Sequence, residues 1–355
     1  MSITSLARAE IQALKPYEAA IQVDDTIRLN ANEAPWKSSG DHFRRPLNRY
    51  PEIRPAGLRA MLSSRYGCKP ENLMVTRGTS EAIDLLIRVF CRAGKDNLVT
   101  TRPTFSMYEH YAVVQGAELR QVTTSGDADF EIAADEILGA CDDSTKLIFL
   151  CSPNNPTGTL LPRSVLIEIL ERRATRSAVV VDEAYIEFAG EESAVKLFEK
   201  YENLIVLRTL SKALAFAGAR CGSVIAAPDV IQMLDAVQAP YALATPVVEC
   251  VENALQAEST DEAEDWITRT INERERLGIA LRKLPFVRHA WPSAANFILV
   301  EVADARALMQ HSADDKVLLR YFGGDLSDCV RITIGTPAEN DRLLESMASM
   351  GVSHV

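Results

Sequence analysis

The sequence lacks the features that mark metal-binding, disulfide-bonded and membrane-spanning proteins. Its five histidines are isolated, with no HxH or HExxH pair, so we expect no metal site. Its seven cysteines are scattered and never spaced as CxxC, which argues against a disulfide framework or a zinc site and suits a reducing compartment. There is no signal-peptide pattern, and no apolar run approaches the length of a membrane span. We therefore predict a cytoplasmic protein.

Basic residues are also in short supply. The chain has 38 lysines and arginines against 49 aspartates and glutamates, a formal net charge of −11. This balance argues against nucleic acid or an anionic membrane surface as the partner. A small anionic substrate remains compatible with it, because a local cluster of arginines can outweigh the global charge. The length of 355 residues fits two domains, or one large domain with a smaller one attached.

The middle of the chain alternates apolar, strand-like runs with amphipathic helical stretches, which is typical of an α/β fold with a mostly parallel sheet and helices on both faces. The runs are continuously apolar, as expected for strands buried on both sides. They span residues 73–76, 98–99, 147–150, 179–181, 204–207 and 224–227. A charged helical stretch at about 261–284 then leads to a smaller α+β part, with strands predicted at 296–300, 317–322 and 330–334. A capping box with proline at its first helical position opens the last helix at Thr336.

Two polar segments follow predicted strand ends, where open α/β sheets bind ligands. Thr79 and Ser80 lie at a helix start, whose free backbone N–H groups suit a phosphate-sized anion, although an ordinary helix cap explains them equally well. The loop at 152–158 is rigid because it contains two prolines and a glycine, and it holds Asn155 in a set place. A tight turn is the simpler explanation of that loop.

Two further segments carry groups that can react. Asp182 follows three valines at a strand end, where a buried carboxylate needs a partner such as a pyridinium N–H, unless it merely caps the next helix. Tyr185, three residues on, is within reach of a neighbouring phenolic oxygen. Lys212 would ordinarily be a surface lysine, but Ser211 and Arg220 beside it would both be phosphate ligands. Partial desolvation next to an arginine and a dianion suits a lysine that forms a Schiff base.

The order and spacing of these four segments resemble those of the fold-type I, aspartate-aminotransferase-like pyridoxal-phosphate enzymes. From about residue 14 to residue 336 the chain is similar to the histidinol-phosphate aminotransferase family, in the segments LKPYE, LNANE, NRYPE, PTFSMY, CSPNNPTG, VDEAY, TLSKALAFAGARCG, LLRYF and VRITIG. The resemblance implies a large α/β domain over residues 41–280, which binds pyridoxal 5′-phosphate. It also implies a small α+β domain formed by residues 1–40 and 281–355.

The implied activity is a transamination of histidine biosynthesis. The amino group is exchanged between L-histidinol phosphate and 2-oxoglutarate by a ping-pong mechanism, giving imidazole-acetol phosphate and L-glutamate. The alternatives within the same fold are a threonine-phosphate decarboxylase-like enzyme and an aromatic amino-acid aminotransferase. A catalytically silent cofactor-binding module is the alternative from another class, and the presence of Lys212 and Asp182 argues against it.

The resemblance also implies the roles of the residues around the cofactor ring. Lys212 holds the cofactor as a Schiff base and shuttles a proton at the substrate Cα. Asp182 pairs with the pyridine nitrogen and keeps it protonated. Asn155 and Tyr185 hydrogen-bond the 3′ oxygen of the ring. Phe105 stacks on the ring face, where the family more often has tyrosine, and Tyr108 is the alternative stacking residue.

The cofactor phosphate is held, by the same resemblance, by Thr79, Ser80, Ser211 and Arg220. Family members often have alanine-aspartate in place of Thr79-Ser80, a change that keeps the backbone donors and adds hydroxyls. Tyr50 is expected to reach the phosphate from the neighbouring subunit, so that a homodimer becomes part of the mechanism.

The substrate side must accept two amino donors, one with a phosphate and one with a carboxylate. An arginine can bind either oxyanion through its planar fork. Arg331 matches the family residue in that role, with Asn155 beside it, and Arg320 and Tyr17 are expected to contact the substrate phosphate.

Overall fold

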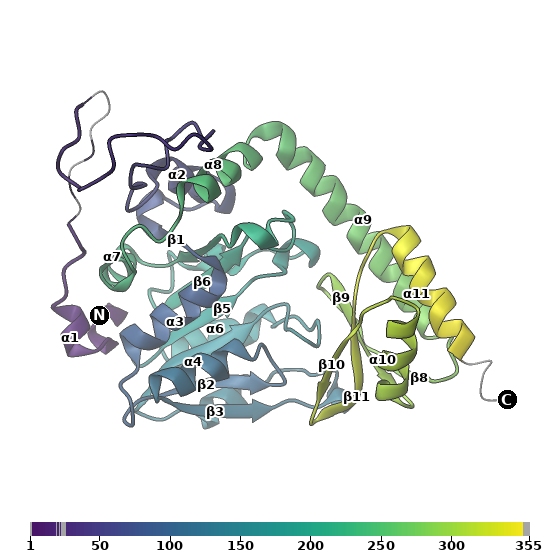
Figure 1. The fold of residues 1–355 in the computed structure, drawn as a ribbon. Coiled ribbons are helices and arrows are strands. Elements are labelled where there is room, and N and C mark those ends of the chain that lie inside the picture. The colour runs from purple at the N-terminus through teal and green to yellow at the C-terminus, as the bar shows by residue number, and fades with distance from the viewer. Residues whose placement is uncertain (1, 19, 21, 23–25, 351–355) are drawn as a thin grey trace.

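A large twisted sheet forms the centre of the protein. The computed structural model describes residues 2–18, 20, 22 and 26–350, and within them seven strands pair in the order β1-β7-β6-β5-β4-β2-β3 (Figure 1). Strand β7 is antiparallel to β1 and β6, whereas the pairs from β6 through β5, β4 and β2 to β3 are parallel. The predicted mostly parallel α/β sheet is therefore confirmed. The strands are β1 (Leu73–Thr76), β2 (Asn97–Arg102), β3 (Glu118–Thr123), β4 (Thr145–Cys151), β5 (Ala178–Asp182), β6 (Leu204–Thr209) and β7 (Gly222–Ile225).

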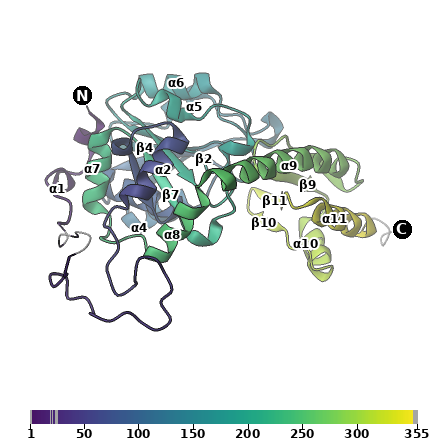
Figure 2. The same cartoon turned by 90° about the horizontal axis from the view of Figure 1, so that it is seen from above.

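Helices cover both faces of this sheet, which explains why its central strands are apolar throughout. Alternate residues of β5 belong to different cores: Val179 and Val181 pack on one side and Val180 on the other. The first core is closed by α2 (Ala56–Tyr66), α5 (Ala134–Gly139), α6 (Arg163–Arg172) and α8 (Thr245–Ala254). The second is closed by α3 (Gly78–Phe90), α4 (Met107–Gln115) and α7 (Pro228–Val237). In the view from above, α5 and α6 lie on one side of the sheet and α4 on the other (Figure 2).

A long helix, α9 (Ala257–Leu281), leads from the large sheet to a second, smaller domain (Figure 1). That domain has a four-stranded sheet in the order β10-β11-β9-β8. Its apolar core includes Leu277 and Leu281 from the end of α9. The capping box is confirmed, because the amide of Thr336 donates to Glu339 (2.8 Å) and the amide of Glu339 donates back to the Thr336 hydroxyl (3.4 Å). The elements are β8 (Val287–Ala290), β9 (Phe297–Val302), α10 (Ala305–Asp314), β10 (Arg320–Gly323), β11 (Leu326–Thr333) and α11 (Pro337–Met350).

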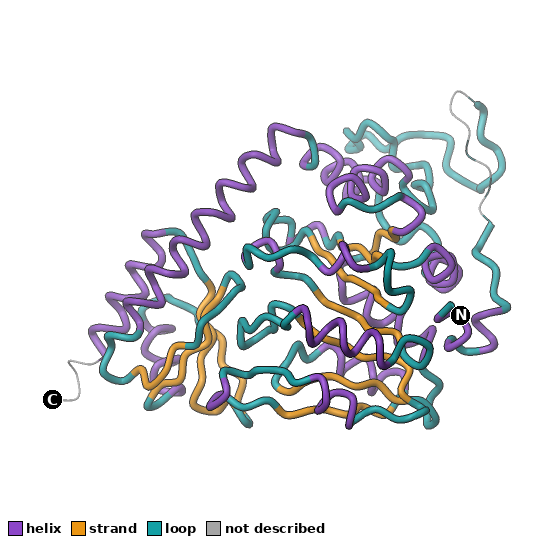
Figure 3. Tube along the Cα trace, turned by 180° about the vertical axis from the view of Figure 1, so that it is seen from behind, coloured by secondary structure: helices purple, strands orange, loops and turns teal. Residues whose placement is uncertain are grey.

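The N-terminal segment lies on the large domain, which differs from the expectation that residues 1–40 join the small one. Ile3 and Ala7 are buried in the same apolar core as residues of α3 and α7, because the apolar side chains of this segment are removed from water there. The short helix α1 (Ala9–Gln12) follows, and an extended arm then passes along the outside of the large domain (Figures 1 and 3). Within the described ranges, no helix is both long enough and apolar enough to cross a bilayer.

Candidate active site

A cavity of about 600 Å³ lies where the carboxyl ends of the parallel strands face the β10–β11 hairpin of the small domain. In an open α/β sheet this edge is where side chains from several strand ends converge. Most of the predicted site residues line the cavity, in agreement with their expected clustering. They are Thr79, Ser80, Phe105, Asn155, Asp182, Tyr185, Ser211, Lys212, Arg220, Arg320 and Arg331.

Asp182, the last residue of β5, is a buried carboxylate with one unpaired oxygen. Its side chain is 2% exposed, and its Oδ2 accepts a hydrogen bond from the hydroxyl of Tyr108 (2.9 Å). Its Oδ1 is buried and has no hydrogen-bond partner among the described residues. Burial raises the pKa of Asp182 to about 6, although the Tyr108 hydroxyl, the Ala184 amide and Lys212 all act to lower it. An unpaired buried carboxylate oxygen costs free energy unless a ligand donates to it.

Lys212 follows β6 and lies in an environment that favours its neutral form. Burial lowers the pKa of the Lys212 ammonium, and the positive charges of Arg331 and Arg220 lower it further, while Asp182 opposes them. Its Nζ lies 5.7 Å from the centre of the Tyr185 ring. An amine with a lowered pKa is the form that attacks carbonyl groups and accepts protons.

The phosphate-sized end of the cavity is built on a close approach between two backbones. Thr79 and Ser80 lie in the first turn of α3, where backbone N–H groups have no partner within the helix. A Cβ added at Gly222, in β7, would lie 2.8 Å from the carbonyl carbon of Gly78 and 2.9 Å from the amide nitrogen of Thr79. A Cβ at Gly78 would in turn lie 2.7 Å from Nη2 of Arg220. Both glycines are therefore needed for the guanidinium and the helix start to meet.

Asn155 connects the two domains across the cavity. Its Oδ1 accepts a hydrogen bond from Nη1 of Arg331, and its Nδ2 donates to the hydroxyl of Tyr185 (3.3 Å). Arg331 is thus fixed at one nitrogen, while its buried Nε has no partner among the described residues. The guanidinium retains free donors for an oxyanion beside the bond to Asn155.

Arg320 and Arg331 are directly opposite each other in the β10–β11 ladder, so their side chains lie on the same face of the hairpin. Neither guanidinium has a carboxylate partner among the described residues. Like charges placed opposite each other across strands are destabilising, and an anion bound between them removes that cost. The sequence predicted both arginines as oxyanion ligands, and the hairpin brings them together at the cavity.

Tyr50 and Tyr17 are not among the residues that line the cavity of their own chain. Both are exposed, by 50% and 57% respectively. Tyr50 stacks on Tyr241 with ring centres 4.6 Å apart. Burial, and then the nearby Tyr17 and Tyr50 hydroxyls, raise the pKa of Tyr241, so the three phenols form one surface cluster. Tyr17 and Tyr50 therefore lie together on the surface, outside the cavity of their own chain.

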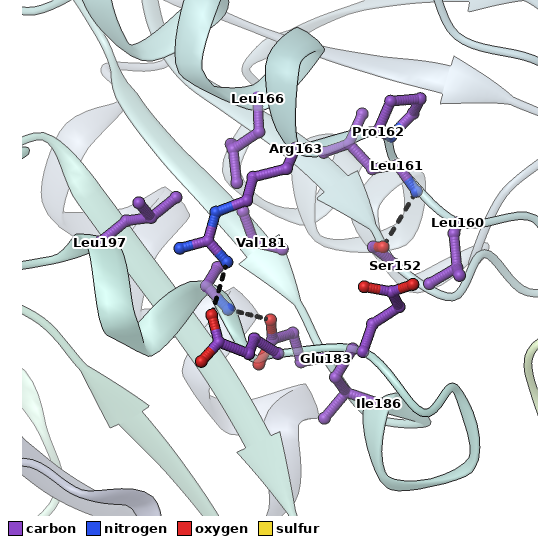
Figure 4. A pocket seen from close by; sticks show the side chains of 13 residues that line it. Ser152, Leu160, Leu161, Pro162, Arg163, Leu166, Val181, Glu183, Ile186 and Leu197 are labelled. Atoms are coloured by element: carbon purple, nitrogen blue, oxygen red, sulfur yellow. Dashed lines mark hydrogen bonds and ion pairs between the residues drawn. The ribbon is translucent and has the colours of Figure 1, made fainter.

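A second cavity has a different lining. This cavity, drawn in Figure 4, has a volume of about 210 Å³ and a mainly aliphatic lining around Leu161, Leu166 and Val181. An ion pair between Arg163 and Glu192 (3.3 Å) closes it on one side. Among its other acids, Glu183 accepts hydrogen bonds from the Ser193 hydroxyl and from the Ala194 amide. In the part of the chain that the structure describes, no group of three histidines, cysteines or acids is placed to hold a metal ion.

Three residues of the site were not assigned from the sequence. Tyr108 was considered only as a ring-stacking residue, whereas it is fully buried and binds Asp182 through its hydroxyl. Its position three residues after Phe105 on a helix start was the available signal. No sequence pattern marks Gly222 as part of the site, because its role depends on the pairing of β7 with β1. Phe322 belongs to the LLRYF segment, for which the resemblance implied no role at this position. It lines the cavity two residues after Arg320.

Comparisons with known proteins agree with this geometry. Residues 25–347 match the family model described as aminotransferase class I and II. A histidinol-phosphate aminotransferase of Xylella fastidiosa (strain 9a5c) is 42% identical over 349 residues, which cover 97% of this chain and 95% of the relative. The structure is similar to that of histidinol-phosphate aminotransferase from Sinorhizobium meliloti in complex with pyridoxal-5′-phosphate, with a TM-score of 0.79, 24% identity and coverage of 87% and 84% of the two chains. It also resembles an L-threonine-O-3-phosphate decarboxylase from Porphyromonas gingivalis, with a TM-score of 0.69, 24% identity and coverage of 86% and 91%.

Proposed function

The chain belongs to the class I and II aminotransferase family, and from this premise we propose that it transfers the amino group of L-histidinol phosphate to 2-oxoglutarate. The products are imidazole-acetol phosphate and L-glutamate, the reaction is a ping-pong exchange, and its place is in histidine biosynthesis. The observation that carries the choice of substrate is the pair of guanidiniums, Arg320 and Arg331, that face one cavity with Lys212. A site for two different oxyanions needs donors of that kind.

Pyridoxal 5′-phosphate is the cofactor that these residues fit. The unpaired Oδ1 of Asp182 has the chemistry to accept a bond from a pyridinium N–H. Thr79, Ser80, Ser211 and Arg220 would hold its phosphate, Asn155 and Tyr185 its phenolic oxygen, and Phe105 its ring face. When bound, the cofactor supplies an electron sink that stabilises the negative charge left on the substrate Cα after proton removal.

Side chains of the protein would hold the cofactor, move protons and bind the substrates. Lys212 would carry the cofactor through Nζ and, once released, move the proton at the substrate Cα, for which its lowered pKa favours the neutral form. The bond from Tyr108 holds the Asp182 carboxylate in place, so that a proton on the pyridine nitrogen is retained. Arg331 would bind the carboxylate of glutamate or the phosphate of histidinol phosphate, and Arg320 would add its charge to the phosphorylated donor.

A homodimer completes the proposed site. Tyr50 lies outside the cavity of its own chain, and its exposed hydroxyl is available to the cofactor phosphate of a second copy. Tyr17 belongs to the same surface cluster and would reach the partner's substrate phosphate by the same route. Very exposed apolar side chains on the extended arm, Ile27, Leu29 and Trp36, suit burial against that second copy. Seven unpaired cysteines are in keeping with a cytoplasmic location.

A half-reaction tests this function. The purified holoenzyme is mixed in turn with histidinol phosphate, glutamate, phenylalanine and threonine phosphate, and the absorbance of the bound cofactor is followed by stopped flow. We expect rapid conversion with the first two. Rapid conversion by phenylalanine with none by histidinol phosphate would show an aromatic aminotransferase instead. Release of carbon dioxide from threonine phosphate would show a decarboxylase.

A further inference from the structure

One aromatic ring, that of Phe322, contacts both arginines of the cavity. Arg320 and Arg331 are cross-strand neighbours, and the pairing register shifts between Tyr321 and Gly323. Phe322 lies at this irregularity of the ladder, on the strand that carries Arg320. Irregular pairing of this kind re-aims side chains and is frequent beside active sites.

The ring of Phe322 contacts both guanidiniums. Its centre is 5.5 Å from the Cζ of Arg320 and 5.4 Å from the Cζ of Arg331. On the other side of Arg331, the ring of Phe297 lies 5.1 Å from the same Cζ. Contacts in this range are attractive because the face of an aromatic ring is negative. One aromatic ring therefore offsets part of the repulsion between two like charges.

The two arginines depend on this ring to different extents. Arg331 is partly buried and keeps its bond to Asn155 and its contact with Phe297 when Phe322 is removed. Arg320 is exposed, and its guanidinium lies over the ring of Phe322. Loss of the ring would leave Arg331 in place but would let Arg320 adopt many rotamers. Substrate binding would then have to order the Arg320 side chain again, at a cost in conformational entropy.

We propose that Phe322 is a specificity-determining residue, which holds Arg320 ready for the phosphorylated amino donor. Phe322 acts through Arg320 and Arg331 and takes no part in the proton transfers. This inference rests on the proposed function, since Arg320 is useful only if one substrate carries a second oxyanion. It predicts that the ring improves binding of phosphate more than binding of a carboxylate.

The test compares three variants of the holoenzyme. Phe322→Leu removes the ring but keeps apolar bulk, and Phe322→Tyr keeps the ring as a rescue. Tyr321→Leu is a matched control on the opposite face of the same strand, where the Tyr321 ring lies 5.5 Å from the Cζ of Arg306, away from the cavity. For each protein we would measure KM and kcat with histidinol phosphate and with glutamate. Inhibition constants for inorganic phosphate and for glutarate would be measured as well.

In Phe322→Leu we expect KM for histidinol phosphate and the inhibition constant of phosphate to rise about two- to fivefold, with kcat unchanged. The constants for glutamate and glutarate should change by less than about twofold, because Arg331 keeps its other contacts. Phe322→Tyr and Tyr321→Leu should both bind phosphate as the wild type does. Unchanged phosphate binding in Phe322→Leu would overturn the inference, and so would an equal loss in Tyr321→Leu or a failure of Phe322→Tyr to restore binding. A wild-type enzyme that does not convert histidinol phosphate would instead contradict the proposed function.

Discussion

Replacing Asp182 with asparagine should stabilise the cofactor-free protein while weakening its hold on the cofactor. In the folded chain Asp182 is 2% exposed, and one oxygen of its carboxylate has no partner. Burial raises its pKa from 3.8 to about 6. Asparagine has nearly the same shape and carries no charge, so it avoids the cost of burying the carboxylate. Without its acid, however, the protein loses the partner of the pyridinium N–H.

The size of the effect follows from the two pKa values. A difference of about two pKa units corresponds to about 3 kcal/mol of unfolding free energy. Because the folded-state pKa is the higher one, the folded state binds more protons than the unfolded state between the two values. The contribution of Asp182 to stability is therefore greatest below pH 3.8 and is lost as the pH rises through about 6. At pH 8 the asparagine variant should be more stable by about 3 kcal/mol, and at pH 5 by about half of that.

The assay is denaturant unfolding of the cofactor-free wild type and variant at pH 5 and pH 8, at equal protein concentration. Glu183→Gln is the matched control, because the neighbouring Glu183 is also buried but accepts bonds from Ser193 and the Ala194 amide and lies 3.6 Å from Arg208. Burial raises the pKa of Glu183 as well, but its neutralisation should stabilise the protein less than that of Asp182, because Ser193, the Ala194 amide and Arg208 lose the charge that they contact. A cofactor-free Asp182→Asn protein that is less stable than the wild type at pH 8 would refute the reasoning.

Three further predictions concern the cavity. Lys212→Ala should abolish turnover while the protein still retains cofactor through its other contacts; measurable turnover in that variant would remove Lys212 from the mechanism. Arg331→Ala should raise KM for both amino donors, whereas Arg320→Ala should mainly raise KM for the phosphorylated one, and equal changes in steady-state kinetics would refute that division. Gly222→Ala should weaken cofactor binding about tenfold or more in a titration, because its Cβ would meet the backbone of Gly78 at 2.8 Å; wild-type affinity would show that β7 and the start of α3 can separate at little cost.

The core of the fold is predictable from sequence because buried parallel strands are continuously apolar. The runs around Val180 and Ile205 are of this kind, and their strands were found with small errors at the ends. Strand β3 was missed because it is an edge strand with partly exposed side chains, in the run Glu118–Thr123. Strand β8 was missed for the same reason, since two of its four residues are exposed.

The predicted site residues came mainly from family motifs, and the structure adds what motifs do not encode. Asp182 and Lys212 follow strands directly, so their meeting at one edge of the sheet is a consequence of parallel topology. The bond from Tyr108 to Asp182 depends on how α4 packs against the sheet, which no local pattern specifies. The facing of Arg320 and Arg331 depends on hairpin register, which is fixed only when the strands pair.

The central claim is that an amino group passes from histidinol phosphate to 2-oxoglutarate in the cavity around Lys212. The most direct measurement uses histidinol phosphate labelled with ¹⁵N at its amino group, incubated with holoenzyme and 2-oxoglutarate, followed by mass spectrometry of the glutamate formed. The account predicts that the label appears in glutamate in step with loss of histidinol phosphate, and that Lys212→Ala gives none. Unlabelled glutamate, or none at all, from the wild-type enzyme would contradict it.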